Sequence, residues 1–357
     1  MEMKLAENIR HYRKQRGLTQ EQLAEALGVT VGAVHKWEAK LSTPELALIT
    51  EMADFFDVSV DALLGYRMKD NSLKATMDRM SACIGTEDPA GVAEAEKALK
   101  RFPHSFDIVF LSALTFMIFG GKNKDREMLN RASGLLEQSL LLLPQNTHKS
   151  VRSICIHEYL STVQLMLGNA DRAAEQLKEH NTEGVYDDLI GMTLSLMCKK
   201  PDEAEPYLSR ALLDALGKLV QTVVGKAYAY ALKGDHESAE KLLKWELSVL
   251  AGVRQPEATG YLDQTCAYLY ALLSFVYLKK GHTGEARDAL CLARNLAERF
   301  DAAPAYDARS FRFVTGVEEY HMHNILGRTA KDSVGYMIRV AGNEPLAALW
   351  KEICENE

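Results

Sequence analysis

The sequence lacks paired cysteines and the short motifs of common catalytic sites. No Cys-x-x-Cys pair, Gly-rich phosphate loop, His-Glu-x-x-His motif or Ser-His-Asp arrangement is present. His321 and His323 are two residues apart and would point to different sides of a helix, which does not favour a metal site. We therefore expect no enzyme activity, no cofactor and no metal. We expect buried thiols in a reducing cytoplasm for the six cysteines, at positions 83, 155, 198, 266, 291 and 354.

Long apolar segments are also absent. The N-terminal stretch MEMKLAENIRHYRKQRG is charged and amphipathic, and it has no apolar signal-peptide core. No run approaches the roughly 18 apolar residues of a membrane span. The sequence therefore predicts a cytoplasmic protein without a membrane partner.

A strong excess of charge of either sign is missing as well. The 357 residues carry a net charge of −7, with 47% hydrophobic and 25% charged residues, which is typical of a soluble globular protein. Any contact with nucleic acid must therefore be local. Two basic groups stand out near the N-terminus: Arg10, Arg13, Lys14 and Arg16, and then Lys36 and Lys40.

The stretch QEQLAEALGVTVGAVHKWEA, residues 20–39, predicts two short helices that cross closely. Ala24 is small enough for a close approach, and Gly28 can adopt the left-handed conformation that ends the first helix. Thr30 is the expected N-cap of the second helix. The buried side is predicted to consist of Leu23, Ala24, Leu27, Gly28, Val29, Val34 and Trp37. The exposed side keeps a short row that fits a DNA major groove, namely Val31, Gly32, Ala33, His35 and Lys36.

Three further helices complete a predicted domain of residues 1–66. Gly17 ends the first helix, and Thr19 with Gln22 forms a capping box for the second. Pro44 suits the first turn of the fourth helix, and Ser59 caps the fifth. The polar residues 67–74 are the expected linker.

The rest of the chain predicts an all-α array, because apolar residues recur at three- and four-residue spacings. Four turn-and-helix pieces align on alanines, each followed four residues later by a leucine: Ala173, Ala204, Ala239 and Ala286 with Leu177, Leu208, Leu243 and Leu290. Two of the intervals are close to the roughly 34-residue period of tetratricopeptide units. We expect stacked helical hairpins over residues 75–304 and capping helices over 305–357, with an irregular helical bundle as the alternative.

The first 65 residues closely resemble the Xre-type, lambda-repressor-like helix-turn-helix family, through LGVTVGAVHKWE and TPELALITEMADFFDVSVDALLG. The resemblance implies a five-helix domain that binds a double-stranded DNA operator, commonly as a homodimer. It places Thr30, Val31, Gly32, His35 and Lys36 at base edges and Gln20 at a phosphate. The basic Arg10 and Lys40 complete the predicted DNA-binding set.

The array of residues 75–357 resembles, less specifically, the tetratricopeptide domains of Rgg- and PlcR-like peptide-pheromone receptors. That resemblance implies an inner face that binds a signalling peptide or another small ligand. The predicted ligand contacts are Tyr186, Gln221, Tyr228, Tyr268, Phe275 and Lys279.

Taken together, these patterns predict a dimeric transcription regulator whose helical repeats mediate dimerisation and sense a ligand. Two alternatives stay open. The repeats could form a protein-interaction module that DNA binding localises, or the protein could be a ligand-independent repressor in which the repeats only dimerise.

Overall fold

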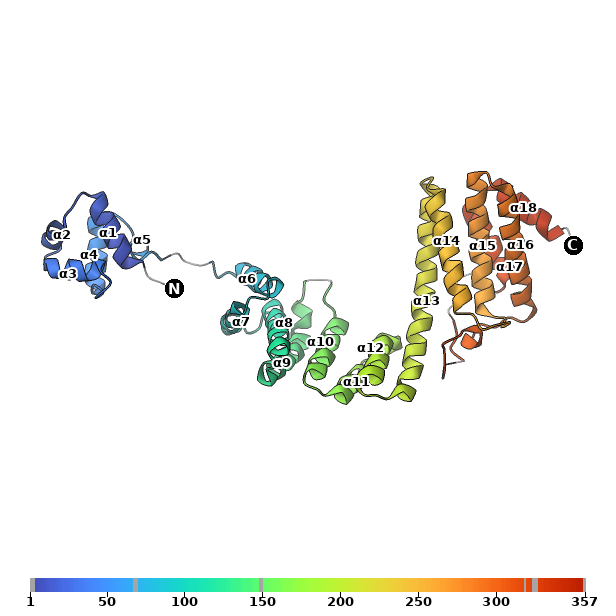
Figure 1. The fold of residues 1–357 in the computed structure, drawn as a ribbon, viewed down its shortest axis with the longest axis horizontal. Coiled ribbons are helices and arrows are strands. Elements are labelled where there is room, and N and C mark those ends of the chain that lie inside the picture. Colours follow the sequence, from blue (N-terminus) through green and yellow to red (C-terminus); the bar gives the residue numbers. More distant parts are fainter. Residues whose placement is uncertain (1–3, 67–69, 148–149, 318, 323–326, 356–357) are drawn as a thin grey trace. The chain divides into compact units, whose positions relative to one another are not determined.

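The computed structural model describes residues 4–66, 70–147, 150–317, 319–322 and 327–355. The described residues are helical, with a single isolated bridge between Arg254 and Phe311 in place of any strand. They form two compact units, Met1–Thr86 and Glu87–Glu357 (Figure 1). The predicted all-α class is confirmed. The finer boundaries at residues 66, 75 and 305 stay predictions.

The helices of the first unit are α1 (Leu5–Gln15), α2 (Gln20–Ala26), α3 (Val31–Glu38), α4 (Leu46–Phe56), α5 (Val60–Leu64) and α6 (Leu73–Gly85). Those of the second are α7 (Ala90–Arg101), α8 (Phe106–Asn123), α9 (Arg126–Leu142), α10 (Ser153–Met166), α11 (Ala170–Glu179), α12 (Asp187–Met192), α13 (Pro201–Leu232), α14 (His236–Gly252), α15 (Tyr261–Lys280), α16 (Thr283–Ala302), α17 (Ala330–Ala341) and α18 (Glu344–Glu355). A π-helical segment, Thr193–Met197, continues α12, and short 3₁₀ turns lie at Leu143–Gln145, Thr182–Gly184 and Ala308–Ser310.

The local signals of the first five helices act as predicted. Thr19 and Gln22 form a reciprocal capping box at the start of α2, and the Thr30 hydroxyl accepts from the backbone N–H of Ala33 at the start of α3. Gly28 has φ +63°, the left-handed conformation that favours glycine. One detail was wrong: α4 begins at Leu46, so Pro44 precedes the helix and does not form its first turn.

In the second unit, helices adjacent in the chain pack against one another as antiparallel hairpins. The aligned alanines occupy the contacts between paired helices, and Ala173, Ala204, Ala239 and Ala286 are all fully buried. A buried serine on α10 and another on α15 donate hydrogen bonds to the carbonyl oxygens of Ala173 (3.3 Å) and Ala286 (2.8 Å). The alanine side chain is small enough to allow this close approach of two backbones.

Helix α13 departs from the expected hairpins because it runs unbroken for 32 residues. Its N-terminal part pairs with α12, and its C-terminal part pairs with α14. It therefore serves as the second helix of one hairpin and the first helix of the next. A regular array would place a turn between these two hairpins, and α13 has no such turn.

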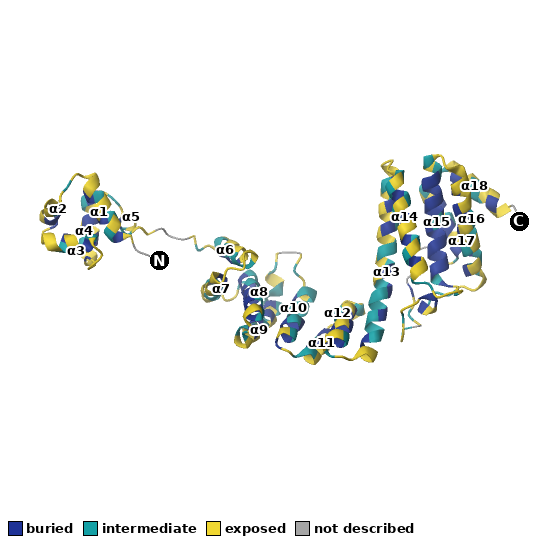
Figure 2. Ribbon diagram, viewed as in Figure 1, coloured by how far each residue is buried: buried dark blue, intermediate teal, exposed yellow. Residues whose placement is uncertain are grey.

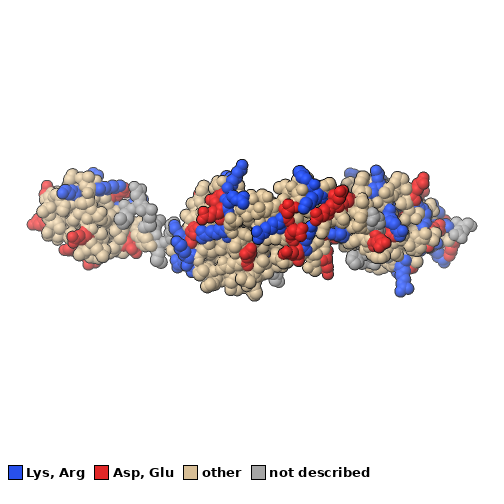
Figure 3. All heavy atoms as spheres, turned by 90° about the horizontal axis from the view of Figure 1, so that it is seen from below, with Lys and Arg blue, Asp and Glu red and all other residues tan. Residues whose placement is uncertain are grey.

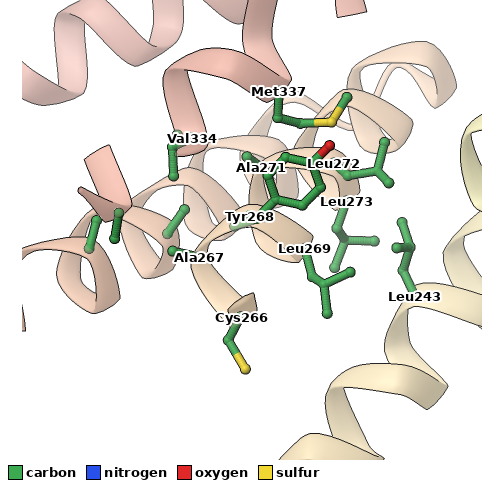
Figure 4. Close-up of a cluster of buried hydrophobic side chains, with 14 of the residues drawn as sticks. Leu243, Cys266, Ala267, Tyr268, Leu269, Ala271, Leu272, Leu273, Val334 and Met337 are labelled. Atoms are coloured by element: carbon green, nitrogen blue, oxygen red, sulfur yellow. The ribbon is translucent and has the colours of Figure 1, made fainter. Parts of the chain in front are cut away.

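Helix α15 is the centre of the C-terminal core, and Figure 2 shows it buried along most of its length. It contacts α13, α14, α16, α17 and α18. Figure 4 shows Tyr268 and Leu272 of α15 beside Met337 of α17. The helical pair expected within residues 305–357 is present as α17 and α18, and α17 covers one side of α15.

By length and composition alone, α8 resembles a helix that crosses a membrane, but 61% of this segment is buried inside the protein, as in the core helix of a hairpin. One expectation from composition was wrong. The six cysteines are free, but only Cys266 is buried, whereas Cys354 is exposed and the others are half-buried.

Glu246 of α14 is an uncompensated carboxyl group in the core. Its side chain is 0% exposed, and neither oxygen has a hydrogen-bond partner among the described residues. Burial raises its pKa, because a carboxylate loses its hydration there. A carboxyl group whose pKa is raised by folding supports the folded state at low pH, and this support is lost as the pH rises through the folded pKa.

We predict that Glu246→Gln stabilises the second unit at pH 7 to 8, on the order of 1 kcal/mol, because the amide carries no charge to bury. The gain should vanish as the pH falls towards 4. Urea unfolding at several pH values measures it, with exposed Glu127→Gln as the control. A loss of stability at pH 8 would show that Glu246 is compensated in the folded protein.

Candidate functional site

The predicted recognition surface of α3, which is the side expected to meet DNA, is open to solvent. The predicted base-contacting residues Thr30, Val31, Gly32, His35 and Lys36 are all exposed, and Val31 is 40% exposed despite its apolar side chain. They lie on the side of α3 opposite Val34 and Trp37, which are buried in the core of the domain. Among residues 4–66 and 70–86, nothing covers this surface.

A polar network behind the recognition surface fixes α3 to α1 and α2. Arg13 of α1 binds Glu38 of α3 through two bonds, from Nε to Oε1 at 2.6 Å and from Nη2 to Oε2 at 2.9 Å. The Gln20 amide donates to the same carboxylate at 2.9 Å, and Arg13 also donates to the carbonyl oxygen of Leu18. One carboxylate therefore joins all three helices at the base of the recognition helix.

The pKa shifts of Glu38 and Arg13 favour the charged form of both groups. Burial alone would raise the pKa of Glu38, but hydrogen bonds from Arg13 and Gln20 outweigh burial and hold it below its usual value. The hydrogen bond to Glu38 raises the pKa of Arg13. The charge of exposed Arg10 also lowers the pKa of Glu38. Such a bidentate pair sets the angle between two helices as well as their distance.

Several residues of the basic groups and of the predicted DNA-binding set have partners within the domain. Arg13, grouped with the basic residues of the first helix, is buried and bound to Glu38. Gln20 is half-buried, and its amide is held by Glu38. Lys40 is exposed and binds the Glu7 carboxylate at 2.9 Å. The exposed cations of the predicted set are therefore Arg10, Lys36 and Lys40, and of these Lys40 is paired with Glu7.

Sequence reasoning missed Glu38, the residue on which this network depends. Arg13 and Glu38 are separated by 25 residues, and neither belongs to a local motif. A charged residue on the buried side of each predicted helix was the available signal. That signal does not identify the partner.

The structure buries half of the predicted ligand contacts. Tyr186, Tyr268 and Phe275 are at most 6% exposed, so as placed they are core residues and present no open inner face. Tyr228 donates from its hydroxyl to the carbonyl oxygen of Val340 in α17, and its ring neighbours Phe275.

The remaining two contacts are exposed. Lys279 lies over the Phe275 ring, whereas Gln221 stands apart from this group. The structure thus brings Tyr228, Phe275 and Lys279 together, beside α17.

A cavity that sequence reasoning missed lies elsewhere in the second unit, with a volume of about 840 Å³. The elements around it are α10, the end of α11, the following loop, the start of α12 and the middle of α13. Tyr186 is the one predicted ligand residue in its wall. No group of three or more metal-ligating side chains occurs in the parts of the chain that the structure describes, which exclude His323.

We predict that Glu38→Gln destabilises the first unit at pH 7 by roughly 1–3 kcal/mol, because it removes the charged acceptor of Arg13. A carboxyl group whose pKa is lowered by folding stabilises the folded state at any pH above its unfolded pKa. This stabilisation is lost as the pH falls through the folded pKa. The difference from the parent should therefore close in acid. Hydrogen exchange of the amides in residues 5–64 measures it, with Glu25→Gln as the exposed control; equal protection at pH 7 would contradict the role of the network.

The first unit is similar to known DNA-binding domains. Residues 9–63 match the family model described as Helix-turn-helix. The HTH-type transcriptional activator BcrR of Enterococcus faecalis is 39% identical over 62 residues, which are 17% of this chain and 30% of BcrR. The HTH-type transcriptional regulator YobD of Bacillus subtilis (strain 168) is 39% identical over 59 residues, 16% of this chain and 53% of YobD. The chain thus spans about a third and about half of these two relatives.

Two further similarities complete the comparison. A crystal structure of Bacillus thuringiensis PlcR in complex with the peptide PapR7 and DNA aligns with 83% of this chain and 95% of that one, at 15% identity and a TM-score of 0.23. The HTH-type transcriptional regulator YazB of Bacillus subtilis (strain 168) is 40% identical over 55 residues, 15% of this chain and 80% of YazB. The resemblance of the first 65 residues is confirmed, and the chain belongs to the helix-turn-helix family of DNA-binding transcriptional regulators.

Proposed function

We propose that this protein is a cytoplasmic, dimeric and sequence-specific regulator whose second unit senses a peptide or another small ligand. The observation that carries the DNA-binding part is the exposed surface of α3, held from behind by the Arg13–Glu38 pair. A rigid helix with a free outer surface is what readout of a major groove requires. The two exposed side chains of that surface with ring or ammonium donors are His35 and Lys36.

Dimerisation follows from the weak polarity of the same surface. Val31 and Gly32 cannot form bidentate hydrogen bonds with bases, so one head has few means to discriminate sequences. On the face shown in Figure 3, Lys and Arg side chains lie among Asp and Glu side chains, so this face adds no large basic region. Two half-sites about 34 Å apart would supply the missing specificity.

Ligand sensing is supported by the cavity between α10 and α13. Its volume of about 840 Å³ lies in the range of small-molecule and peptide sites. The cavity is in the second unit, so its occupant would act on DNA binding through a change in the dimer. For that, the ligand must bind one arrangement of the protein more tightly than the other.

We predict that the double substitution of His35→Ala and Lys36→Ala weakens binding to an operator selected in vitro by the full-length protein at least tenfold. The reason is the loss of the donors on α3. Gel-shift titration at fixed salt measures the effect. Exposed Lys97→Ala with His104→Ala in the second unit is the matched control; unchanged affinity of the α3 variant, with normal folding, would refute the assignment.

We predict that the fragment of residues 1–86 binds the same operator at least tenfold more weakly than the full-length protein, because it loses the proposed dimer contacts. Light scattering should give a monomer for the fragment and a dimer for the full chain. Equal affinity for the operator would show that the second unit contributes neither dimerisation nor control.

A further inference from the structure

The walls of the 840 Å³ cavity carry an excess of negative charge. Four carboxylic acids and one lysine line it: Glu179, Glu183, Asp188, Asp214 and Lys218. In the part of the chain that the structure describes, Glu179, Glu183 and Asp188 take part in no ion pair or side-chain hydrogen bond, whereas Asp171 of α11 and Glu203 of α13 are paired with lysines. Three acids therefore line the cavity without an ion-pair partner among the described residues, although Lys218 lies in the same wall.

The basic groups near the cavity do little to balance these acids. Arg210 of α13 is engaged by the buried Asp187 carboxylate through bonds of 2.7 and 3.2 Å. The His157 ring lies 3.8 Å from that of His180, centroid to centroid. Burial, together with the charge of His180, lowers the pKa of His157 and favours its neutral form at pH 7. The cavity thus keeps its acidic character at neutral pH.

Apolar side chains also line the cavity. Ile154, Val185 and Ala211 contribute apolar surface. The Tyr186 ring is 1% exposed, and its hydroxyl donates to the carbonyl oxygen of Ile154 at 3.1 Å. A lining that combines apolar side chains with carboxylates suits an alkyl chain that ends in a cation, because the chain can pack against the apolar side chains while the charge meets the acids.

We propose that this cavity binds a primary ammonium group carried on an alkyl chain, with Glu179, Glu183 and Asp188 as its carboxylate partners. The assignment rests on the proposed function, since it names the chemistry of the ligand that the second unit would sense. The volume accommodates several peptide residues, and a lysine-containing peptide is the source we favour. A free polyamine offers the same ammonium chemistry.

One carboxylate of the cavity joins it to a distant segment. Asp214 accepts a hydrogen bond of 2.8 Å from the Tyr320 hydroxyl, and one turn earlier Ser209 accepts from the backbone N–H of Thr315 at 3.0 Å. Thr315 and Tyr320 thus lie against α13 beside the cavity. An ammonium group that draws on Asp214 would compete with Tyr320 for it.

The test is calorimetric titration of the full-length protein with three probes. They are acetyl-Gly-Lys-Leu-Lys-Gly-amide, its glutamate counterpart acetyl-Gly-Glu-Leu-Glu-Gly-amide, and spermidine. We expect the lysine peptide to bind at one site per chain and the glutamate peptide to bind at least tenfold more weakly. The double variant Glu183→Gln with Asp188→Asn should weaken binding of the lysine peptide at least tenfold. The control variant Glu127→Gln with Glu137→Gln, on α9 outside the cavity, should leave this binding unchanged. Glu179→Gln is the independent second variant if the double variant misfolds.

The outcomes separate the ligand class from the sensing role. The cation site would be overturned if the two peptides bind equally well, or if the α9 control variant also loses binding of the lysine peptide. Spermidine binding that competes with a weaker lysine peptide supports the site and identifies a polyamine as its source. A lysine peptide that binds in the cavity without changing the gel-shift affinity for the operator leaves the cation site standing and removes the sensing function. If the glutamate peptide alone changes the gel-shift affinity for the operator, the sensing function stands and the cation site is overturned.

Discussion

The close approach of paired helices at alanine is the constraint on which both units depend. Ala24 permits it between α2 and α3, and Ala173, Ala239 and Ala286 permit it in the helical hairpins. Where Ser161 and Ser274 donate to the carbonyl oxygens of Ala173 and Ala286, the two backbones are near enough for a side chain of one to reach the main chain of the other. A larger residue at these positions would separate the helices and open the core, because interiors are packed to the density of crystals.

Features decided within one or two helical turns could be predicted from the sequence. The capping box at Thr19, the cap at Thr30 and the left-handed Gly28 are of this kind, since each depends on residues a few positions away. The alanine register was visible because it repeats along the chain. The small and apolar pattern around residues 20–39 likewise identified the recognition helix and its exposed side.

What could not be predicted depends on segments distant in the chain. The inner face expected at Tyr228, Tyr268 and Phe275 is covered by α17, which follows more than fifty residues later in the chain. These aromatic residues therefore pack against protein and do not line an open ligand site. Periodicity assigns a residue to a side of its helix, but it does not reveal which other segment lies there. The cavity escaped notice for the same reason, since α10, α11 and α13 all contribute to its wall.

The unbroken α13 gives the second unit a direct mechanical connection. Its first half lines the cavity through Ala211 and Asp214, and its second half packs on α14 and the central α15. A regular hairpin array would place a flexible turn between these two halves, and a displacement at one would be absorbed there. In a continuous helix the backbone hydrogen bonds resist bending, so a shift of α13 at the cavity must move its contacts with α14 and α15 as well. The feature that departs most from a regular repeat is thus the one that would suit this unit to convert the proposed ligand binding into a change of packing.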